Sequence, residues 1–108
     1  MSGFVRAGVF GEIQEGELRA FELPQGRVCI AHAGGDVYAF SDECTYQGCS
    51  LAEDGQLVDD ETVECTRDDS RFELGTGEPA GGPAVDPLRV FRIQVVDGWV
   101  EVGPPADE

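Results

Sequence analysis

The sequence CTYQGC at residues 44–49 and the sequence CTRDDS at residues 65–70 decide the fold of this chain. Each begins with a cysteine, and together they carry three of the four cysteines of the protein. Apolar residues are sparse from Asp42 to Leu74, so this region reads as a loop-rich insertion between strands. Because thiolates are ligands of soft metal ions, two cysteine-bearing loops in one region indicate a candidate metal site.

Short apolar runs, separated by turns rich in glycine, fill the rest of the chain. Two of them are expected to form a hairpin around the turn at residues 34–36. This spacing predicts the all-β class, as an antiparallel sandwich or small barrel. The expected strands cover residues 17–23, 27–31, 37–40, 88–96 and 99–102.

The apolar faces of these runs predict the core of the protein. Cys29 lies in the run at residues 27–31, outside the two cysteine-bearing loops, and is expected to be a buried packing residue. The residues expected in the core are Phe4, Leu18, Val28, Ile30, Tyr38, Phe40, Phe91, Ile93, Val95 and Trp99.

The chain is strongly acidic, with 22 acidic residues against seven arginines, no lysine and a formal net charge of −15 over 108 residues. This balance argues against binding to nucleic acid or to anionic lipid. A basic protein partner is the natural complement, and a contribution to solubility alone is the alternative.

The sequence predicts a cytoplasmic protein without a membrane segment. Residues 1–6 contain no apolar run of signal-peptide length, and no stretch approaches the ~18 apolar residues of a spanning helix. In that compartment the cysteines are expected as reduced thiols or metal ligands rather than as a disulfide framework. We expect one domain over residues 1–103 and a short acidic tail over residues 104–108.

The order of the motifs along the chain resembles that of the Rieske-type 2Fe-2S ferredoxin family. After the two cysteine-bearing loops come the sequences RFEL at residues 71–74, GTGE at residues 75–78 and GGPAVDPL at residues 81–88, which is similar to the family's proline-containing loop. The resemblance covers nearly the whole chain. It implies an antiparallel β-sandwich base with a small loop-rich cluster-binding subdomain at about residues 42–74.

The resemblance also implies a ligand set for a 2Fe-2S cluster. The family binds one iron through two cysteines and the other through two histidines, and Cys44 and Cys65 match the cysteines. Tyr46 and Asp68 stand at the histidine positions, where either an oxygen ligand or a residue without contact to metal is expected. An anionic oxygen ligand should lower the reduction potential relative to imidazole.

Two further positions of the family's loops bear on the cysteines and the cluster. Cys49 matches a cysteine that forms a disulfide in the higher-potential members of the family. The position of its partner cysteine is Arg67 in this chain, so we expect Cys49 to be a free thiol unless Cys44 or Cys65 captures it. Because both matched cysteines would bind one iron, the metal-free protein is expected to form a Cys44–Cys65 disulfide in air. Ser70 matches a serine that hydrogen-bonds to a bridging sulfide in that subgroup.

The sequence contains no recognisable catalytic set, so we do not expect an enzyme. The one histidine, His32, matches neither ligand position and is expected at the surface or at a strand end. No Ser-His-Asp or Cys-His arrangement is evident, and no phosphate-binding glycine motif opens a helix.

Three functions are compatible with this sequence. The first is electron transfer through an altered 2Fe-2S site, with a flavin reductase or a terminal oxygenase as the protein partner. The second is a cluster-free binding or regulatory subunit that keeps the fold, similar to the small subunit of NADH-dependent nitrite reductases. The third is a mononuclear metal site that uses Cys44 and Cys65 with Cys49 or Asp68, for which zinc and iron are the plausible metals. An engineered ligand knockout of an ordinary ferredoxin would also have this sequence.

Overall fold

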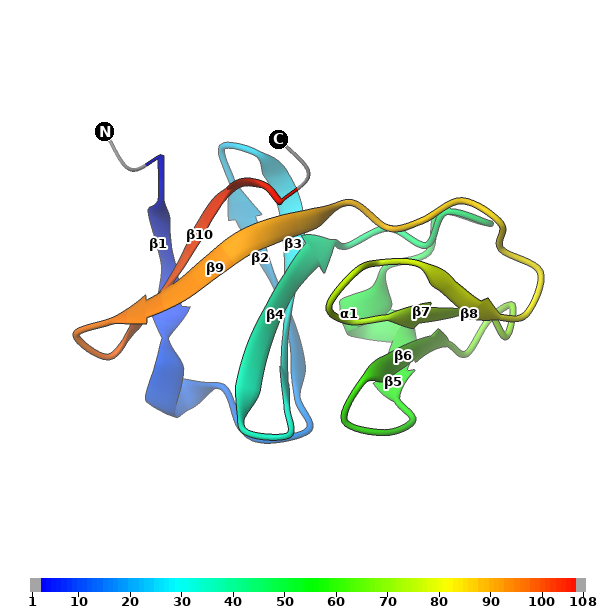
Figure 1. The fold of residues 1–108 in the computed structure, drawn as a ribbon, viewed down its shortest axis with the longest axis horizontal. Helices are drawn as coiled ribbons and strands as arrows, with labels where there is room; N and C mark the ends of the chain where they lie inside the picture. The colour runs from blue at the N-terminus through cyan, green and yellow to red at the C-terminus, as the bar shows by residue number, and fades with distance from the viewer. Residues whose placement is uncertain (1–2, 107–108) are drawn as a thin grey trace.

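The computed structural model describes residues 3–106, which form two antiparallel sheets (Figure 1). The large sheet has six strands in the order β1-β10-β9-β4-β3-β2, and we call it the base. The small sheet has four strands in the order β5-β6-β7-β8. The predicted all-β class, with a sandwich-like base and a smaller subdomain, is confirmed.

The base curls, so that its edge strands β1 and β2 come into contact. The base strands are β1 (Val5–Val9), β2 (Leu18–Leu23), β3 (Gly26–Ala33), β4 (Asp36–Ser41), β9 (Val90–Val96) and β10 (Trp99–Pro105). The small sheet consists of β5 (Gly55–Leu57), β6 (Thr62–Cys65), β7 (Arg71–Glu73) and β8 (Pro79–Gly81). A 3-10 turn, η1 (Phe10–Glu12), follows β1, and a one-turn helix, α1 (Leu51–Asp54), precedes β5.

Strand β3 supplies side chains to two separate cores. Val28 and Ile30 point into the curl of the base, whereas Cys29, Ala31 and Ala33 point toward the small sheet. Because successive side chains of a strand lie on opposite faces, a strand buried on both faces is apolar at every position. This explains the continuous apolar run around Cys29, which is fully buried as predicted.

The core between the sheets fixes the small sheet to the base. Phe40 of β4 packs there with Leu51 of α1 and with Phe72 of β7, and all three are fully buried. The other core, inside the base, consists of Ile13, Val28, Ile30, Ala39, Phe91, Val100 and Val102.

The prediction that Val95 belongs to the core is wrong, because its side chain is 45% exposed. Strand β9 pairs with β4 only at Val90 and Phe91, so the later part of β9 extends beyond β4. The β9–β10 hairpin therefore projects from the base, as its end in Figure 1 shows. The buried side of β10 is formed by Val100 and Val102 instead.

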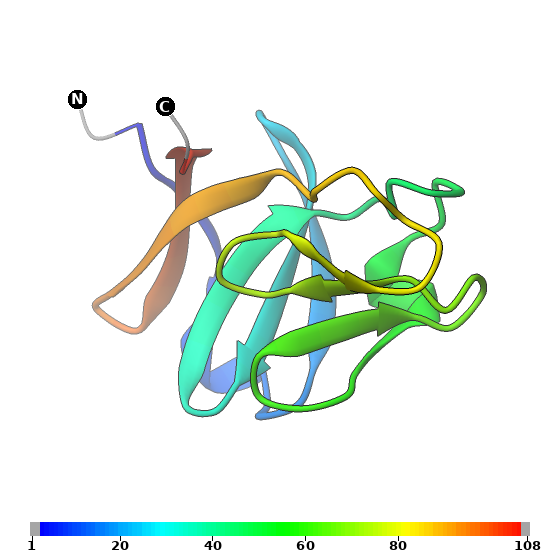
Figure 2. The ribbon, with the colours of Figure 1, turned by 45° about the vertical axis from the view of Figure 1, so that its right-hand side comes forward.

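The small sheet continues beyond residue 74, where the cluster-binding subdomain was expected to end. Strand β8 adds residues 79–81, and the Leu88 N–H donates to the Gly77 oxygen at 2.8 Å. We therefore call residues 42–88 the tip. Figure 2 shows the tip beside the base, at the end of the molecule opposite β1 and β10.

The end of the chain also differs from the prediction. Strand β10 continues through Pro105, and the Ala106 N–H donates to the Val90 oxygen at 2.8 Å. The expected tail at residues 104–108 is therefore part of the base through Ala106, and residues 107 and 108 lie outside the described residues. A single domain over residues 1–103 stays a prediction. Within residues 3–106 no helix has the length and apolar character needed to cross a membrane.

Candidate metal centre

The first loop of the tip, residues 42–50, follows β4 and brings two cysteines together. The Cys44 N–H donates to the Cys49 oxygen at 2.9 Å, and the Gly48 N–H donates to the Cys44 oxygen at 2.8 Å. Gly48 has a φ of +77°, a conformation that glycine adopts without steric cost. This closed turn places Cys44 and Cys49 side by side although four residues separate them.

The second loop, residues 65–70, repeats this hydrogen-bond pattern. The Cys65 N–H donates to the Ser70 oxygen at 2.8 Å, and the Asp69 N–H donates to the Cys65 oxygen at 2.9 Å. Asp69 has a φ of +63° and takes the place of Gly48 in the pattern, which aspartate tolerates better than most residues. The two loops therefore present their first cysteines in equivalent backbone settings.

Four potential ligands meet where the loops face each other. The sulfur atoms of Cys44, Cys49 and Cys65 and a carboxylate oxygen of Asp68 all lie within 4.8 Å of one another. Cys49 and Cys65 form a disulfide, while Cys44 is a buried free thiol that donates to Asp68 Oδ2 at 3.2 Å. The predicted Cys44–Cys65 disulfide is therefore wrong, because the first loop turns Cys49 toward Cys65 and Asp68 binds the Cys44 thiol.

The surroundings of Cys44 and Asp68 act in opposite directions on their proton affinities. Burial raises the pKa of the Cys44 thiol, against the N–H groups of Tyr46 and Gln47 that lower it, and the Asp68 carboxylate adds to the rise. Partial burial raises the pKa of Asp68, but the nearby Ser70 hydroxyl, the hydrogen bond from the Ser70 N–H and that from the Cys44 thiol outweigh it and leave the pKa lowered. The metal-free site at neutral pH thus pairs a thiol with a carboxylate.

The carboxylate of Asp42 anchors the first loop. It accepts hydrogen bonds from Arg27 Nε at 2.7 Å, from Ser50 Oγ at 2.5 Å and from the Ala52 N–H at 2.7 Å. Asp42 is buried, and its partners lie on β3, on the first loop and on α1. This role of Asp42 is not predictable from the sequence, because nothing local distinguishes it from the other acidic residues of the chain.

Residues 81–87, which we call the Gly-Pro segment, lie against both loops. Thr45 Oγ1 donates to the Asp86 oxygen at 2.7 Å. Gly82 has a φ of +79°, and a Cβ at this position would overlap the Asp69 oxygen and lie 2.7 Å from Ser70 Cα. The close approach of this segment therefore requires glycine at position 82.

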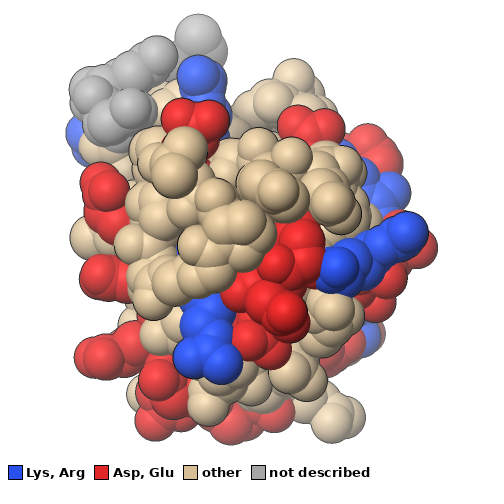
Figure 3. All heavy atoms as spheres, turned by 90° about the vertical axis from the view of Figure 1, so that its right-hand side faces the viewer, with Lys and Arg blue, Asp and Glu red and all other residues tan. Residues whose placement is uncertain are grey.

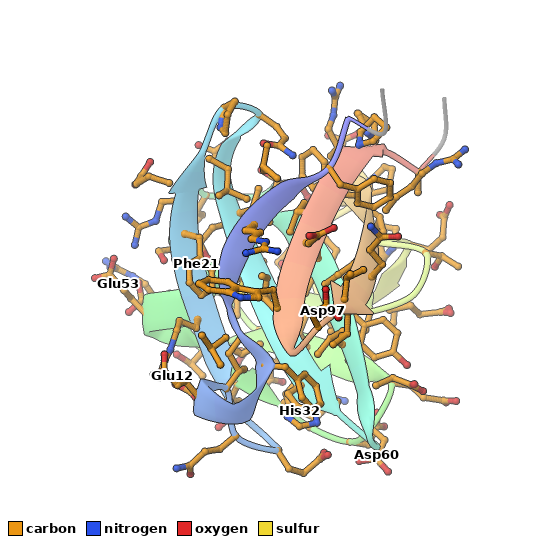
Figure 4. The ribbon with its side chains drawn as sticks, turned by 90° about the vertical axis from the view of Figure 1, so that its left-hand side faces the viewer. Glu12, Phe21, His32, Glu53, Asp60 and Asp97 are labelled. Atoms are coloured by element: carbon orange, nitrogen blue, oxygen red, sulfur yellow. A yellow bond between two sulfur atoms is a disulfide. The ribbon has the colours of Figure 1, made fainter. Side chains whose placement is uncertain are left out.

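The other residues singled out from the sequence, Tyr46, Ser70 and His32, lie in three different environments. Tyr46 is 52% exposed at the surface of the first loop. Ser70 is fully buried, and its hydroxyl has no hydrogen-bond partner among the described residues. His32, the one histidine of the chain, lies on the base beside η1, with Nδ1 2.8 Å from the Ile13 oxygen (Figure 4). No imidazole therefore lies among the four gathered ligands.

Carboxylates gather on the face of the molecule formed by the tip, with a few arginines beside them (Figure 3). Arg67 of the second loop lies 3.5 Å from the carboxylate of Asp54, and Arg71 of β7 lies 2.8 Å from that of Glu64. These arginines are thus already paired with acidic groups of the tip.

The chain matches one protein family over most of its length. Residues 4–92 match the Rieske [2Fe-2S] domain. Among curated proteins, the ferredoxin subunit of the 3-phenylpropionate/cinnamic acid dioxygenase of Escherichia coli is 36% identical over 95 residues, which cover 87% of each chain.

Two solved structures resemble this fold closely. The ferredoxin of carbazole 1,9a-dioxygenase from Nocardioides aromaticivorans matches with a TM-score of 0.88 and 28% identity, covering 95% of this chain and 99% of that one. A chain in the complex of reduced oxygenase and oxidized ferredoxin of carbazole 1,9a-dioxygenase matches with a TM-score of 0.86 and 30% identity, covering 95% and 94%.

Proposed function

This chain belongs to the Rieske [2Fe-2S] domain family, and from this premise we propose that it is a ferredoxin-type electron carrier of an oxygenase system. The observation that carries the proposal is the match over nearly the full length of both chains to the ferredoxin of a dioxygenase. A carrier needs no substrate site of its own. Its task is to hold one electron near the surface and to dock on its partners.

The arrangement of the tip supports this role. The three gathered sulfurs lie in loops at the end of the molecule, and Thr45, Gln47 and Thr66 around them are exposed. A redox centre held there is close to any protein that docks on the tip.

The donor set does not fit the cluster of the family as that cluster is usually bound. A Rieske cluster uses two cysteines on one iron and two imidazoles on the other. Here the only histidine lies on the base, and the resemblance to the family aligns Tyr46 and Asp68 with the two imidazole positions. Coordination of a 2Fe-2S cluster by Cys44, Cys65, Tyr46 and Asp68 stays a prediction, and no step of the proposed function depends on it.

The partners we propose are basic proteins, namely a flavin reductase that supplies electrons and a terminal oxygenase that accepts them. Support comes from the net charge of −15 and from the relative that is seen in complex with its oxygenase. Opposite charge on the partner would steer docking to the acidic face of the tip. In this role the protein is not itself a catalyst, and its cytoplasmic location stays a prediction.

A redox titration tests the proposal directly. The full chain, purified without oxygen, is titrated with a low-potential reductant while its visible absorption and paramagnetic resonance are recorded. We expect a reversible one-electron change, and reduced protein should then be oxidised on mixing with a Rieske-type terminal oxygenase. A folded protein without any one-electron couple would contradict the proposed function.

A cluster-free binding module is the second candidate. The observation in its favour is the Cys49–Cys65 disulfide, which joins the two loops without any metal. This candidate predicts a colourless protein that binds its partner with equal affinity before and after treatment with a chelator.

A further inference from the structure

We propose that the redox centre of this protein is a single iron ion bound by Cys44, Cys49, Cys65 and Asp68. The inference rests on the proposed electron-transfer function and names the group that would carry the electron. It differs from the two-iron cluster in the number of metal ions, in the absence of sulfide and in the use of Cys49 as a ligand.

The geometry of the four ligands favours one ion over two. Their donor atoms all lie within 4.8 Å of one another. A tetrahedral ion with metal–sulfur bonds of about 2.3 Å has donor–donor distances of about 3.8 Å. The pairs that are farthest apart need only a small contraction, while the Cys49 and Cys65 sulfurs must separate once their disulfide is reduced. A two-iron cluster instead needs two pairs of ligands on opposite sides of its core.

The chemistry of the ligands is also that of a single-ion site. Three thiolates and one carboxylate are four anionic donors, and sulfur-rich tetrahedral sites take zinc or iron. Zinc has no accessible redox change, so the proposed function selects iron. A single iron held by these ligands would accept one electron from the reduced flavin of a reductase as Fe(III) becomes Fe(II), and would pass that electron on to the oxygenase as it returns to Fe(III).

The surrounding backbone prepares these ligands for a metal. The Cys44 N–H donates to the Cys49 oxygen at 2.9 Å, which holds these two cysteines side by side in the first loop. The Ser70 N–H donates to Asp68 Oδ1 at 2.9 Å, which leaves Oδ2 directed at the sulfur of Cys44. The hydroxyl of Ser70 is fully buried beside these ligands, where it can donate a hydrogen bond to a thiolate or carboxylate that has lost its proton.

Metal binding and the disulfide exclude each other, because the sulfurs of Cys49 and Cys65 cannot be bonded to each other and bind the ion as thiolates at the same time. Loading therefore begins with a dithiol reductant, whose two thiols become a disulfide while the Cys49–Cys65 bond breaks into two thiols. Binding of Fe(II) then displaces the protons of the three cysteine thiols. Oxidation of the metal-free protein restores the Cys49–Cys65 disulfide.

Metal and sulfide analysis of the full chain, purified without oxygen and after loading with Fe(II), is the first test. We expect one iron per chain, no acid-labile sulfide and a reversible one-electron couple. Two irons with two sulfides would overturn the single-ion inference and leave the proposed function standing. Retention of one zinc in preference to iron would overturn both the single-ion inference and the proposed electron-transfer function. A chain that binds no metal would do the same.

Matched variants test the ligand set. Cys49→Ser should weaken Fe(II) binding by about 100-fold or more, and Asp68→Asn by at least about tenfold. Cys29→Ala and Asp69→Asn are the controls, because these residues lie outside the four ligands, and both should keep one iron. Tyr46→Phe should also keep it. The opposite pattern, loss of metal in Tyr46→Phe and none in Cys49→Ser, would overturn the inference, and circular dichroism verifies that each variant is folded.

Discussion

At the scale of single residues, Asp42 has more influence on the tip than its position in the sequence indicates. Its carboxylate receives hydrogen bonds from three elements: β3, the first loop and α1. Exposed acidic residues are numerous in this chain, and burial distinguishes Asp42 from them. Burial depends on contacts between distant segments, so the sequence alone does not reveal this role.

We expect Asp42→Ala to destabilise the protein by about 2 to 3 kcal/mol, because buried donors of the first loop and α1 lose their acceptor. Urea unfolding of the reduced, metal-free protein measures this change. Glu43→Ala is the control, since Glu43 is the exposed neighbour with the same charge, and it should change stability by less than about 0.5 kcal/mol. Equal stability of the two variants would show that the Asp42 hydrogen bonds contribute nothing net.

Asp69 provides a second prediction at this scale. Its φ of +63° is unfavourable for a side chain, whereas the equivalent Gly48 of the first loop meets no such cost. Asp69→Gly should therefore raise the free energy of unfolding by up to about 1 kcal/mol, and Asp69→Ala should lower it. The comparison of both variants with the parent by thermal unfolding checks the sign, and a loss of stability in Asp69→Gly would contradict the argument.

For the cysteines, the sequence predicts which residues come together but not how their sulfurs pair. Cys44 and Cys65 can be identified as a pair because each begins a loop of the same type. Their actual arrangement depends on the turn that Gly48 allows, which brings Cys49 to Cys65 and leaves Cys44 with Asp68. That choice among three sulfurs is made by tertiary contacts, which sequence spacing does not encode.

At the scale of elements, the long strands are predictable and the short ones are not. The hairpin of β3 and β4 has a two-glycine turn and long apolar runs, which are strong local signals. Strands β5, β7 and β8 have three residues each, too few to show a period of two. They are stabilised by the core they share with the base, which is also why the tip extends past residue 74.

The Gly-Pro segment provides the first prediction for an element. Gly82→Ala should destabilise the tip by about 2 to 4 kcal/mol, because the methyl group adds overlap with the second loop to an unfavourable φ. Gly98→Ala is the control, since its φ is +81° but nothing lies within 4 Å of a Cβ at that position, and a cost of about 1 kcal/mol is expected from the left-handed φ alone. Chemical unfolding of both variants measures the difference, and equal costs would contradict the close approach.

Strand β9 provides a second prediction. Phe91→Ala should cost about 3 to 5 kcal/mol, because Phe91 is 5% exposed and packs inside the base. Val95→Ala on the same strand should cost less than about 1 kcal/mol, because this side chain lies on the projecting hairpin. Urea unfolding distinguishes the two, and a large loss in Val95→Ala would mean that the hairpin packs against the base after all.

At the scale of the whole molecule, the charge of −15 governs encounters with other proteins. We expect the rate of association with a basic terminal oxygenase to fall by about tenfold or more between ~10 and ~150 mM salt. Stopped-flow measurements of electron transfer under second-order conditions give this rate. Oxidation by a small neutral oxidant is the control and should be insensitive to salt. An association rate with the oxygenase that is equally insensitive would assign the acidic residues to solubility.

The tip leaves the base and returns to it at neighbouring points. The Ser41 N–H, at the end of β4, donates to the Arg89 oxygen just before β9 at 2.9 Å, and Phe40 pairs with Val90. The base could thus be closed by a short turn in place of residues 42–88 without any change in its strand order. We therefore expect the unit that carries the proposed metal ligands to be exchangeable as one cassette. A transplanted tip must bring residues equivalent to Leu51 and Phe72, since otherwise the face of the base that carries Cys29 and Phe40 would be left open to water.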